Sequence, residues 1–396
     1  MLWLRGAGTL AFGTAASPIC FLAPSLQFGR QHEATAAIWS SGNAVRNLEE
    51  QGKHNVGRSS RFSVAPMMDW TDRHCRVFHR QMTRHALLYT EMVTALAIRH
   101  GDRQRLLGFN SLEQPVALQL GGSDPKLLAE ASKWGEDFGY SEINLNVGCP
   151  SDRVQTGRFG ACLMAEPELV RDCLGAMRAA VQVPVTIKCR IGIDDQDEED
   201  DFTNFVETVM GSGVTTFIVH ARKAWLKGLS PKENREVPPL NYERVNRIKK
   251  KHIGNNIIIN GGIATIDDAV EHLKHVDGVM LGRAAYNTPW LLSEVDSRIF
   301  GEAREISDPL EVVERMKPYV SQQLAQGVWL QNITRHMLGL FHGLPGGRLW
   351  RRVLSEEAPK PGAGLEVLEK AAKEVASRVS PPADVPPVRP GASFAA

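Results

Sequence analysis

The feature that most constrains this chain is a series of eight short apolar runs, each of which ends in polar residues. The runs lie at residues 62–65, 87–90, 116–120, 142–146, 185–189, 216–220, 256–260 and 278–281. Most are apolar nearly throughout, as is typical of parallel strands that are covered on both faces. Between them, segments such as 124–138 and 167–180 carry apolar residues at helical spacing, with Pro125 and Pro167 near their starts.

Eight strand–helix units within about 230 residues predict a (β/α)8 TIM barrel, an α/β fold that typically takes about 250 residues. A doubly wound sheet is the alternative, but no G-x-G-x-x-G pattern follows the first run. The chain has 396 residues, 43% of them hydrophobic, which is enough for a large core and a second, smaller unit. We expect the barrel to span residues 61–305. The helical pattern of 310–340 predicts a small C-terminal helical domain over residues 306–378.

Both ends of the chain differ from the middle. Residues 1–60 hold no acidic residue before Glu33 and are rich in Ala, Ser and Gly with scattered Arg. This composition is typical of a transit peptide and predicts delivery to an organelle, either a plastid or a mitochondrion. A secretory signal and a disordered extension of a cytoplasmic protein are the alternatives. Residues 379–396 are rich in proline, so we expect a disordered tail there.

Charge and cysteine content exclude several classes of protein. The 46 basic and 45 acidic residues leave a net charge of +1, so any surface that attracts nucleic acid must be local. No stretch of about 18 uninterrupted apolar residues is present, which argues against a transmembrane helix. The six cysteines include no C-x-x-C pair and no zinc-ligand spacing, so we expect reduced thiols and no bound metal. Buried core thiols are expected at Cys75, Cys162, Cys173 and Cys189.

A TIM barrel carries its chemistry at the C-terminal ends of its strands. Polar or reactive residues stand at nearly all of these ends, namely Asp69, Glu91, Gln119, Asn144, Asn146, Cys149, Lys188, Arg190, His220, Arg222, Asn260 and Arg283. A strand that leaves the core often meets water, but that alone does not explain why Lys, His, Gln, Asn and Cys all reach one rim. We therefore predict an active site at this rim.

The last two strand ends favour a phosphate site, because TIM barrels commonly bind phosphate there. The residues concerned are Asn260, Gly261 and Gly262 after the seventh run, and Gly282 and Arg283 after the eighth. Glycine lets the backbone approach phosphate oxygens closely. Lys188 and His220 are placed to hydrogen-bond the electron-rich edge of a flavin, whose anionic reduced ring a cation stabilises.

Seven segments resemble the tRNA-dihydrouridine synthases. They are APMMDWTDRHCR (65–76), LQLGG (118–122), EINLNVGCPSDRVQTGRFGACLM (142–164), VTIKCRIGID (185–194), FIVHARKAWLKGLSPKENREVPPL (217–240), NGGI (260–263) and LGRAAYNTPW (281–290). The segment after His220 and the segment ITRHMLGLFHGLPGGRLWRR (333–352) are similar to the A-type branch of that family. The resemblance covers residues 61–373, which is nearly everything except the two ends.

The resemblance implies an FMN-bound enzyme that reduces uridine to 5,6-dihydrouridine in the tRNA D-loop, at positions 20 and 20a. In the family, NADPH reduces the flavin, the flavin passes a hydride to C6, and a cysteine protonates C5; here that cysteine is Cys149. A thiol is ordinarily protonated at neutral pH, as a proton donor requires. The implied FMN contacts are Pro66, Met67, Met68, Gln119, Lys188, His220, Asn260, Gly261, Gly262, Gly282 and Arg283.

Basic residues are concentrated in two segments. Residues 222–251 hold ten basic residues against three acidic ones, and residues 318–355 hold no acidic residue. Segments rich in basic residues suit phosphate binding, so we expect the helical domain to bind tRNA while the target base is extruded toward the flavin. The expected tRNA contacts are Asn146, Arg190, Lys232, Arg235 and Arg335. We expect a monomer that binds tRNA but neither a membrane nor a metal.

Two other functions fit part of this pattern. A small-molecule flavin oxidoreductase of the dihydroorotate dehydrogenase type would share the barrel and FMN, but the basic C-terminal helices would serve no purpose for a small substrate. A tRNA-binding chaperone would keep the fold without turnover, but it would not need Cys149, Lys188 and His220.

Overall fold

The computed structural model of this chain describes residues 60–196, 199–304 and 306–379, all of which belong to one compact unit. The expected transit peptide and the proline-rich tail lie outside the described residues, apart from Ser60 and Val379. Within the described ranges, no helix is long and apolar enough to cross a membrane.

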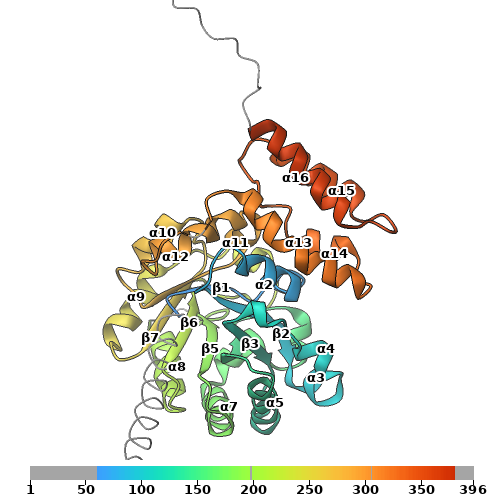
Figure 1. Cartoon of the computed structure of the whole chain (residues 1–396). Helices are drawn as coiled ribbons and strands as arrows, with labels where there is room; N and C mark the ends of the chain where they lie inside the picture. The colour runs from blue at the N-terminus through green and yellow to red at the C-terminus, as the bar shows by residue number, and fades with distance from the viewer. Residues whose placement is uncertain (1–59, 197–198, 305, 380–396) are drawn as a thin grey trace, which may run out of the picture. The chain divides into compact units, whose positions relative to one another are not determined.

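Eight parallel strands close into a barrel in chain order, and β8 pairs with β1 (Figure 1). The strands are β1 (Phe62–Val64), β2 (Leu87–Thr94), β3 (Val116–Gly121), β4 (Glu142–Val147), β5 (Val185–Arg190), β6 (Thr216–His220), β7 (Asn256–Asn260) and β8 (Gly278–Leu281). The predicted TIM barrel is therefore confirmed. Three of the predicted strands have the predicted bounds, and β2 continues four residues beyond its predicted end.

Helices and short 3₁₀ turns follow the strands and cover the outside of the barrel (Figure 1). The α-helices are α2 (Arg73–Arg80), α3 (Ala95–His100), α4 (Arg103–Leu107), α5 (Pro125–Asp137), α6 (Asp152–Thr156), α7 (Pro167–Ala180), α8 (Glu199–Met210), α9 (Tyr242–Lys251), α10 (Ile266–His272), α11 (Arg283–Asn287) and α12 (Val295–Arg298). The 3₁₀ turns are η1 (Ser111–Glu113), η2 (Gly160–Ala165), η3 (Glu233–Arg235) and η4 (Pro289–Glu294).

Helix α5 illustrates why these segments are helical. The carboxylate of Asp124 accepts hydrogen bonds from the backbone N–H groups of Lys126 and Leu127, and Pro125 occupies the first position, where no N–H is needed. Its apolar face buries Leu128 and Ala131 against the sheet. The large apolar core lies between helices and strands, and a second, smaller cluster with Tyr89 fills the inside of the barrel.

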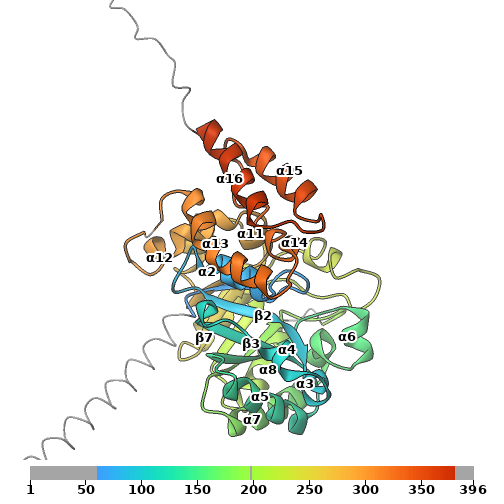
Figure 2. The ribbon, with the colours of Figure 1, turned by 45° about the vertical axis from the view of Figure 1, so that its right-hand side comes forward.

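Four helices follow the barrel: α13 (Pro309–Ala325), α14 (Leu330–Thr334), α15 (Gly347–Glu357) and α16 (Leu365–Val379). The last two pack side by side as a helical pair, as both views show (Figures 1 and 2). The expectation of one helical segment over residues 310–340 is wrong in detail, because Gly327 has a φ of 82° and the chain turns there. Trp350 of α15 is fully buried, and its Nε1 donates to the carbonyl of Met337.

Candidate active site

The strand register brings the predicted rim residues together at the C-terminal end of the barrel. Asn146 of β4 lies opposite Lys188 of β5, and Arg190, His220 and Asn260 occupy matching positions on β5, β6 and β7. Neighbouring residues in a parallel register point to the same side of the sheet, so these side chains share the inside of the rim.

Cys149 lies on the loop after β4, and its thiol is half-buried. The side-chain Oδ1 of Asn146 accepts hydrogen bonds from the N–H groups of Gly148 and Cys149, at 3.1 and 3.0 Å. The carbonyl of Cys149 accepts from the N–H of Ala161 at 2.9 Å. The thiol is 3.6 Å from the hydroxyl oxygen of Ser151. The side chain of Asn146 and the N–H of Ala161 thus hold the loop through its backbone groups, and the Cys149 side chain remains half-buried.

Arg190 also holds this loop. Its Nε donates to the carbonyl of Gly148 at 3.0 Å, and its Nη1 donates to the carbonyls of Lys223 and Asn234 at 3.0 and 2.8 Å. Only 3% of Arg190 is exposed. The expectation that Arg190 contacts tRNA does not fit this burial, because its donors are already directed at three backbone carbonyls. Arg190 instead ties the loop of Cys149 to the long loop after β6.

Cations gather around Lys188 and His220. Burial and the nearby charge of Arg190 lower the pKa of Lys188 to about 8. Burial, together with Arg190, Lys188 and Arg222, holds the pKa of His220 well below its usual range, so the imidazole is neutral at pH 7. Such mutual repulsion among cations indicates a site suited to an anionic ligand.

The turn after β7 requires glycine for two reasons. Gly261 and Gly262 have φ values of 109° and 74°, which residues with a Cβ rarely adopt. A Cβ on Gly261 would lie 2.5 Å from Cδ2 of His220, and one on Gly262 would lie 2.5 Å from Cδ1 of Leu240. The predicted reason for these glycines was close approach to a phosphate; the structure adds that His220 already fills the space beside Gly261.

Two arginines stand next to this turn. Among the described residues, the buried Nε of Arg222 has no hydrogen-bond partner, although its Nη1 donates to the carbonyl of Pro238. Arg283 forms an ion pair with Glu236 and lies at the start of α11. Asn260 donates through Nδ2 to the carbonyl of Met280 and so ties β7 to β8. An unpartnered buried donor beside glycine turns fits an anionic group such as a phosphate.

The loop after β1 lies against the eighth strand end. The N–H of Met67 donates to the hydroxyl of Thr71 at 2.9 Å, which closes the loop over residues 67–71. The sulfur of Met67 lies 3.8 Å from the point that a Cβ on Gly282 would occupy. Pro66 and Met67 are half-buried, whereas Met68 is 54% exposed. The expected FMN contacts on this loop therefore differ in exposure, and Met68 is the outermost of them.

Gln119 lies deeper in the barrel and is buried. Its Oε1 accepts from Nδ2 of Asn146, and its Nε2 donates to Oδ1 of Asn144, both at 2.8 Å. Sequence reasoning singled out Gln119, Asn144 and Asn146. It missed Glu142 and Thr186, which continue this set of contacts toward the N-terminal ends of the strands. The missed signal was the alternation of polar residues at positions 142, 144 and 146, which places all three on the inward face of β4.

The expected tRNA contacts fall into three groups. Lys232 and Arg235 are exposed on the loop after β6, and Asn146 and Arg190 are buried under it. Arg335 was expected to have no acidic partner, and this is wrong. Its Nη2 lies 2.8 Å from a carboxylate oxygen of Asp72, and Nε2 of His336 lies 3.0 Å from the same carboxylate.

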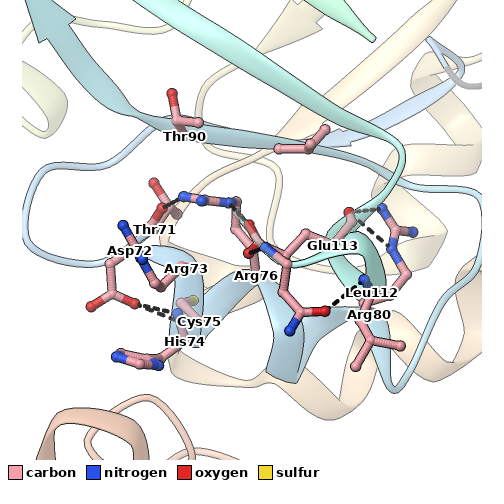
Figure 3. Close-up of polar contacts among 12 residues, drawn as sticks. Thr71, Asp72, Arg73, His74, Cys75, Arg76, Arg80, Thr90, Leu112 and Glu113 are labelled. Carbon is pink, nitrogen blue, oxygen red and sulfur yellow. Dashed lines mark hydrogen bonds and ion pairs between the residues drawn. The ribbon is translucent and has the colours of Figure 1, made fainter. Parts of the chain in front are cut away.

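Asp72 is a junction between the barrel and the C-terminal helices. Its carboxylate accepts from the N–H groups of His74 and Cys75 at the start of α2 (Figure 3). Hydrogen bonds from His336, Cys75 and Arg335 outweigh the effect of burial and hold the pKa of Asp72 well below its usual range. Next to it, Arg76 forms a buried ion pair with Glu113 and donates to the carbonyl of Thr71 (Figure 3). The loop after β1 is therefore fixed from several directions.

Three similar bacterial proteins share one name. The chain is 58% identical over 327 residues to the tRNA-dihydrouridine(20/20a) synthase of Escherichia coli (strain K12), which covers 82% of this chain and 94% of that protein. It is 57% identical over 315 residues to the protein of that name from Xanthomonas campestris, with 80% and 93% covered, and 59% identical over 312 residues to the one from Yersinia pestis, with 78% and 90% covered. A solved 2-naphthoyl-CoA reductase complex has a TM-score of only 0.48 at 10% identity, over 59% of this chain and 49% of that one.

The family model described as dihydrouridine synthase (Dus) matches residues 63–377, which takes in the barrel and the C-terminal helices. This match, the level of identity to the relatives and the rim geometry agree. The chain belongs to the dihydrouridine synthase family.

Proposed function

We propose that this protein reduces uridine to 5,6-dihydrouridine at positions 20 and 20a of the tRNA D-loop, with FMN as the bound cofactor and NADPH as the reductant. The observation that carries the proposal is the placement of the Cys149 thiol, half-buried on a loop fixed by Asn146 and Arg190, beside the cationic rim of the barrel. Family membership and the names of the relatives support the substrate.

The rim residues fit FMN. The glycine turn at Gly261 and Gly262, the unpartnered Nε of Arg222 and the guanidinium of Arg283 form a donor set suited to the single phosphate of FMN. Lys188 and His220, deeper in the rim, suit the electron-rich edge of the flavin ring. When bound, the cofactor would supply the hydride that adds to C6 of the uracil.

Cys149 would supply the proton that completes the reduction at C5. Hydride at C6 places a negative charge on the C5 side of the ring, and transfer of the thiol proton to C5 neutralises it, so one hydride and one proton together saturate the double bond. The hydrogen bonds to the loop on either side of Cys149 keep the sulfur in one place. The positive field of Lys188 and Arg190 then stabilises the thiolate that remains.

The tRNA would approach over the loop that carries Lys232 and Arg235 and over the basic face of α15. Arg348, Arg351 and Arg352 are exposed on that helix. We keep Lys232 and Arg235 as proposed phosphate contacts and exchange Arg335 for this α15 cluster, because Arg335 is paired with Asp72. Lys188 and His220, which would hold the flavin edge, lie on the inside of the barrel rim, so the target base would have to leave its stack to reach the site.

The test uses purified protein, NADPH and a transcribed tRNA that lacks modifications. We expect release of FMN on denaturation, NADPH oxidation that depends on tRNA, and dihydrouridine mapped to positions 20 and 20a. A protein that contains FAD, or that turns over dihydroorotate without tRNA, would support the small-molecule alternative. A protein that binds tRNA without NADPH oxidation would support the chaperone alternative.

We also propose that residues 1–60 direct the chain to a plastid or mitochondrion, since their composition is that of a transit peptide and the family region begins only at residue 63. A fusion of residues 1–60 to a fluorescent protein tests this. Fluorescence in an organelle is the expected result, and diffuse cytoplasmic fluorescence would contradict it.

A further inference from the structure

A continuous series of hydrogen bonds runs through the inside of the barrel and ends at the loop of Cys149. The series begins near the N-terminal ends of the strands. There, the hydroxyls of Tyr89 and Thr186 both donate to Oε1 of Glu142, and the bond from Thr186 is 2.6 Å long. Asn144 donates through Nδ2 to the Thr186 hydroxyl oxygen at 2.8 Å. Gln119 donates to Asn144, and Asn146 donates to Gln119, each at 2.8 Å.

Every bond in this series points the same way. At the top, the N–H groups of Gly148 and Cys149 can only donate, so Oδ1 of Asn146 must face them and Nδ2 must face Gln119. The same reasoning fixes the amides of Gln119 and Asn144 in turn. At the bottom the series needs a group that accepts, and Oε1 of Glu142 accepts two bonds. All six side chains are buried, so none can exchange its partner for water at little cost.

We propose that Glu142 is a positioning residue for Cys149: its acceptor oxygen sets the direction of the hydrogen bonds through Thr186, Asn144, Gln119 and Asn146, and thereby fixes the loop that carries the thiol. The effect of Glu142 on catalysis rests on the function proposed above, whereas the effect of Glu142 on the conformation of the loop does not.

Loss of the acceptor has two outcomes, and both disturb the series. If Thr186 keeps its orientation, its hydroxyl proton is buried without an acceptor. If its hydroxyl turns to donate upward, it meets the Nδ2 group of Asn144, and the amides of Asn144, Gln119 and Asn146 must flip in succession. Asn146 would then present a donor to the N–H groups of Gly148 and Cys149, and the loop would lose both bonds.

Two variants break the series at different links. Glu142→Leu removes the acceptor, and Thr186→Val removes one link while it leaves the Tyr89–Glu142 bond in place. Glu142→Gln keeps an acceptor oxygen and serves as the conservative rescue. Ile258→Val, which removes one methylene from the same barrel interior without touching the series, is the control for a general loss of packing.

The first readout is alkylation of Cys149 by iodoacetamide, followed by peptide mass spectrometry, with the half-buried Cys162 of the same molecule as the internal reference. We expect Cys149 to be alkylated at least about tenfold faster relative to Cys162 in Glu142→Leu and Thr186→Val, because the loop loses its two hydrogen bonds to Asn146 and each contributes up to about a factor of ten. Glu142→Gln and Ile258→Val should match the wild type.

The second readout is the single-turnover rate of dihydrouridine formation, compared with the rate of flavin reduction by NADPH. The first rate should fall about tenfold in Glu142→Leu and Thr186→Val while the second is unchanged, because only the proton donor is displaced. Wild-type thiol reactivity and wild-type turnover in both folded variants would overturn the proposal. If the wild type itself forms no dihydrouridine, the proposed function fails, and the alkylation result still decides the role of Glu142.

Discussion

At the scale of single residues, burial shifts the pKa values of ionisable groups that point into the barrel. Burial raises the pKa of Glu142 to about 7, although the hydroxyls of Thr186 and Tyr89 donate to it and oppose the shift. The same cause lowers the pKa of Lys188 to about 8. Burial thus brings the pKa values of one acid and one base close to neutral pH, where a small change of environment alters their charge most.

The raised pKa of Glu142 predicts a pH dependence of stability. Its ordinary value is 4.5, so between pH 4.5 and 7 the folded chain binds a proton that the unfolded chain releases. This contribution to the free energy of unfolding is full below pH 4.5 and is lost as pH rises through 7. It amounts to about 3 kcal/mol. Because Glu142→Gln cannot titrate, its free energy of unfolding should fall about 3 kcal/mol less than that of the wild type between pH 4.5 and 8.

Urea denaturation of both proteins at several pH values measures this difference. Parallel curves of stability against pH for the wild type and Glu142→Gln would show that Glu142 keeps its ordinary pKa in the folded protein.

Replacement of Cys149 by Ala tests the proposed proton donor. Flavin binding and the single-turnover rate of flavin reduction by NADPH should stay close to wild-type values, because neither uses the thiol. The rate of dihydrouridine formation on tRNA should fall by roughly 10² to 10⁴, the range for loss of a general acid. Cys162→Ser is the matched control and should have full activity. Full dihydrouridine formation by Cys149→Ala would remove Cys149 from the mechanism.

At the scale of elements, the sequence was sufficient for the barrel because each buried parallel strand is a contiguous apolar run that can be recognised by itself. The end of β2 could not be predicted, since Glu91 is polar and yet lies within the strand, where its carboxylate accepts from the N–H of Asp69. The break at Gly327 was equally hidden, because a glycine within a helical pattern is tolerated in other proteins.

Gly261→Ala is the prediction that belongs to the turn after β7. An alanine there would adopt a left-handed φ at a cost of roughly 1–2 kcal/mol and would press its Cβ against His220. We expect the purified variant to lose most of its bound FMN while it still folds. Gly254→Ala is the control, because a Cβ at Gly254 meets only open space. Wild-type flavin content in Gly261→Ala would mean that this turn does not take part in binding the cofactor.

At the scale of the whole molecule, the C-terminal helices are joined to the barrel by contacts between residues far apart in the sequence. Asp72 and Arg335 are one such pair, and His74 of α2 and Tyr319 of α13 are another, with Nδ1 of the imidazole 2.7 Å from the phenol oxygen. Charge patterns along the chain cannot reveal such pairs. For this reason the acid-free segment 318–355 suggested that Arg335 faces RNA, although its acidic partner lies on the loop before α2. The same holds for Arg190, whose backbone partners come from two separate loops.

The distinction between a joining arginine and an RNA-binding arginine can be measured. Arg351 is exposed on α15 and has no ion pair with any residue in the described parts of the chain, whereas Arg335 is paired with Asp72. Arg351→Gln should reduce the log–log slope of tRNA affinity against salt by about 0.9 for a duplex contact or about 0.7 for a single strand, with stability unchanged. Arg335→Gln should leave that slope unchanged and lower the free energy of unfolding by up to about 1 kcal/mol, because the pair is partly exposed. Should Arg335→Gln instead reduce the salt slope without loss of stability, its guanidinium must leave Asp72 for a phosphate, and the basic surface would extend from α15 down to the barrel.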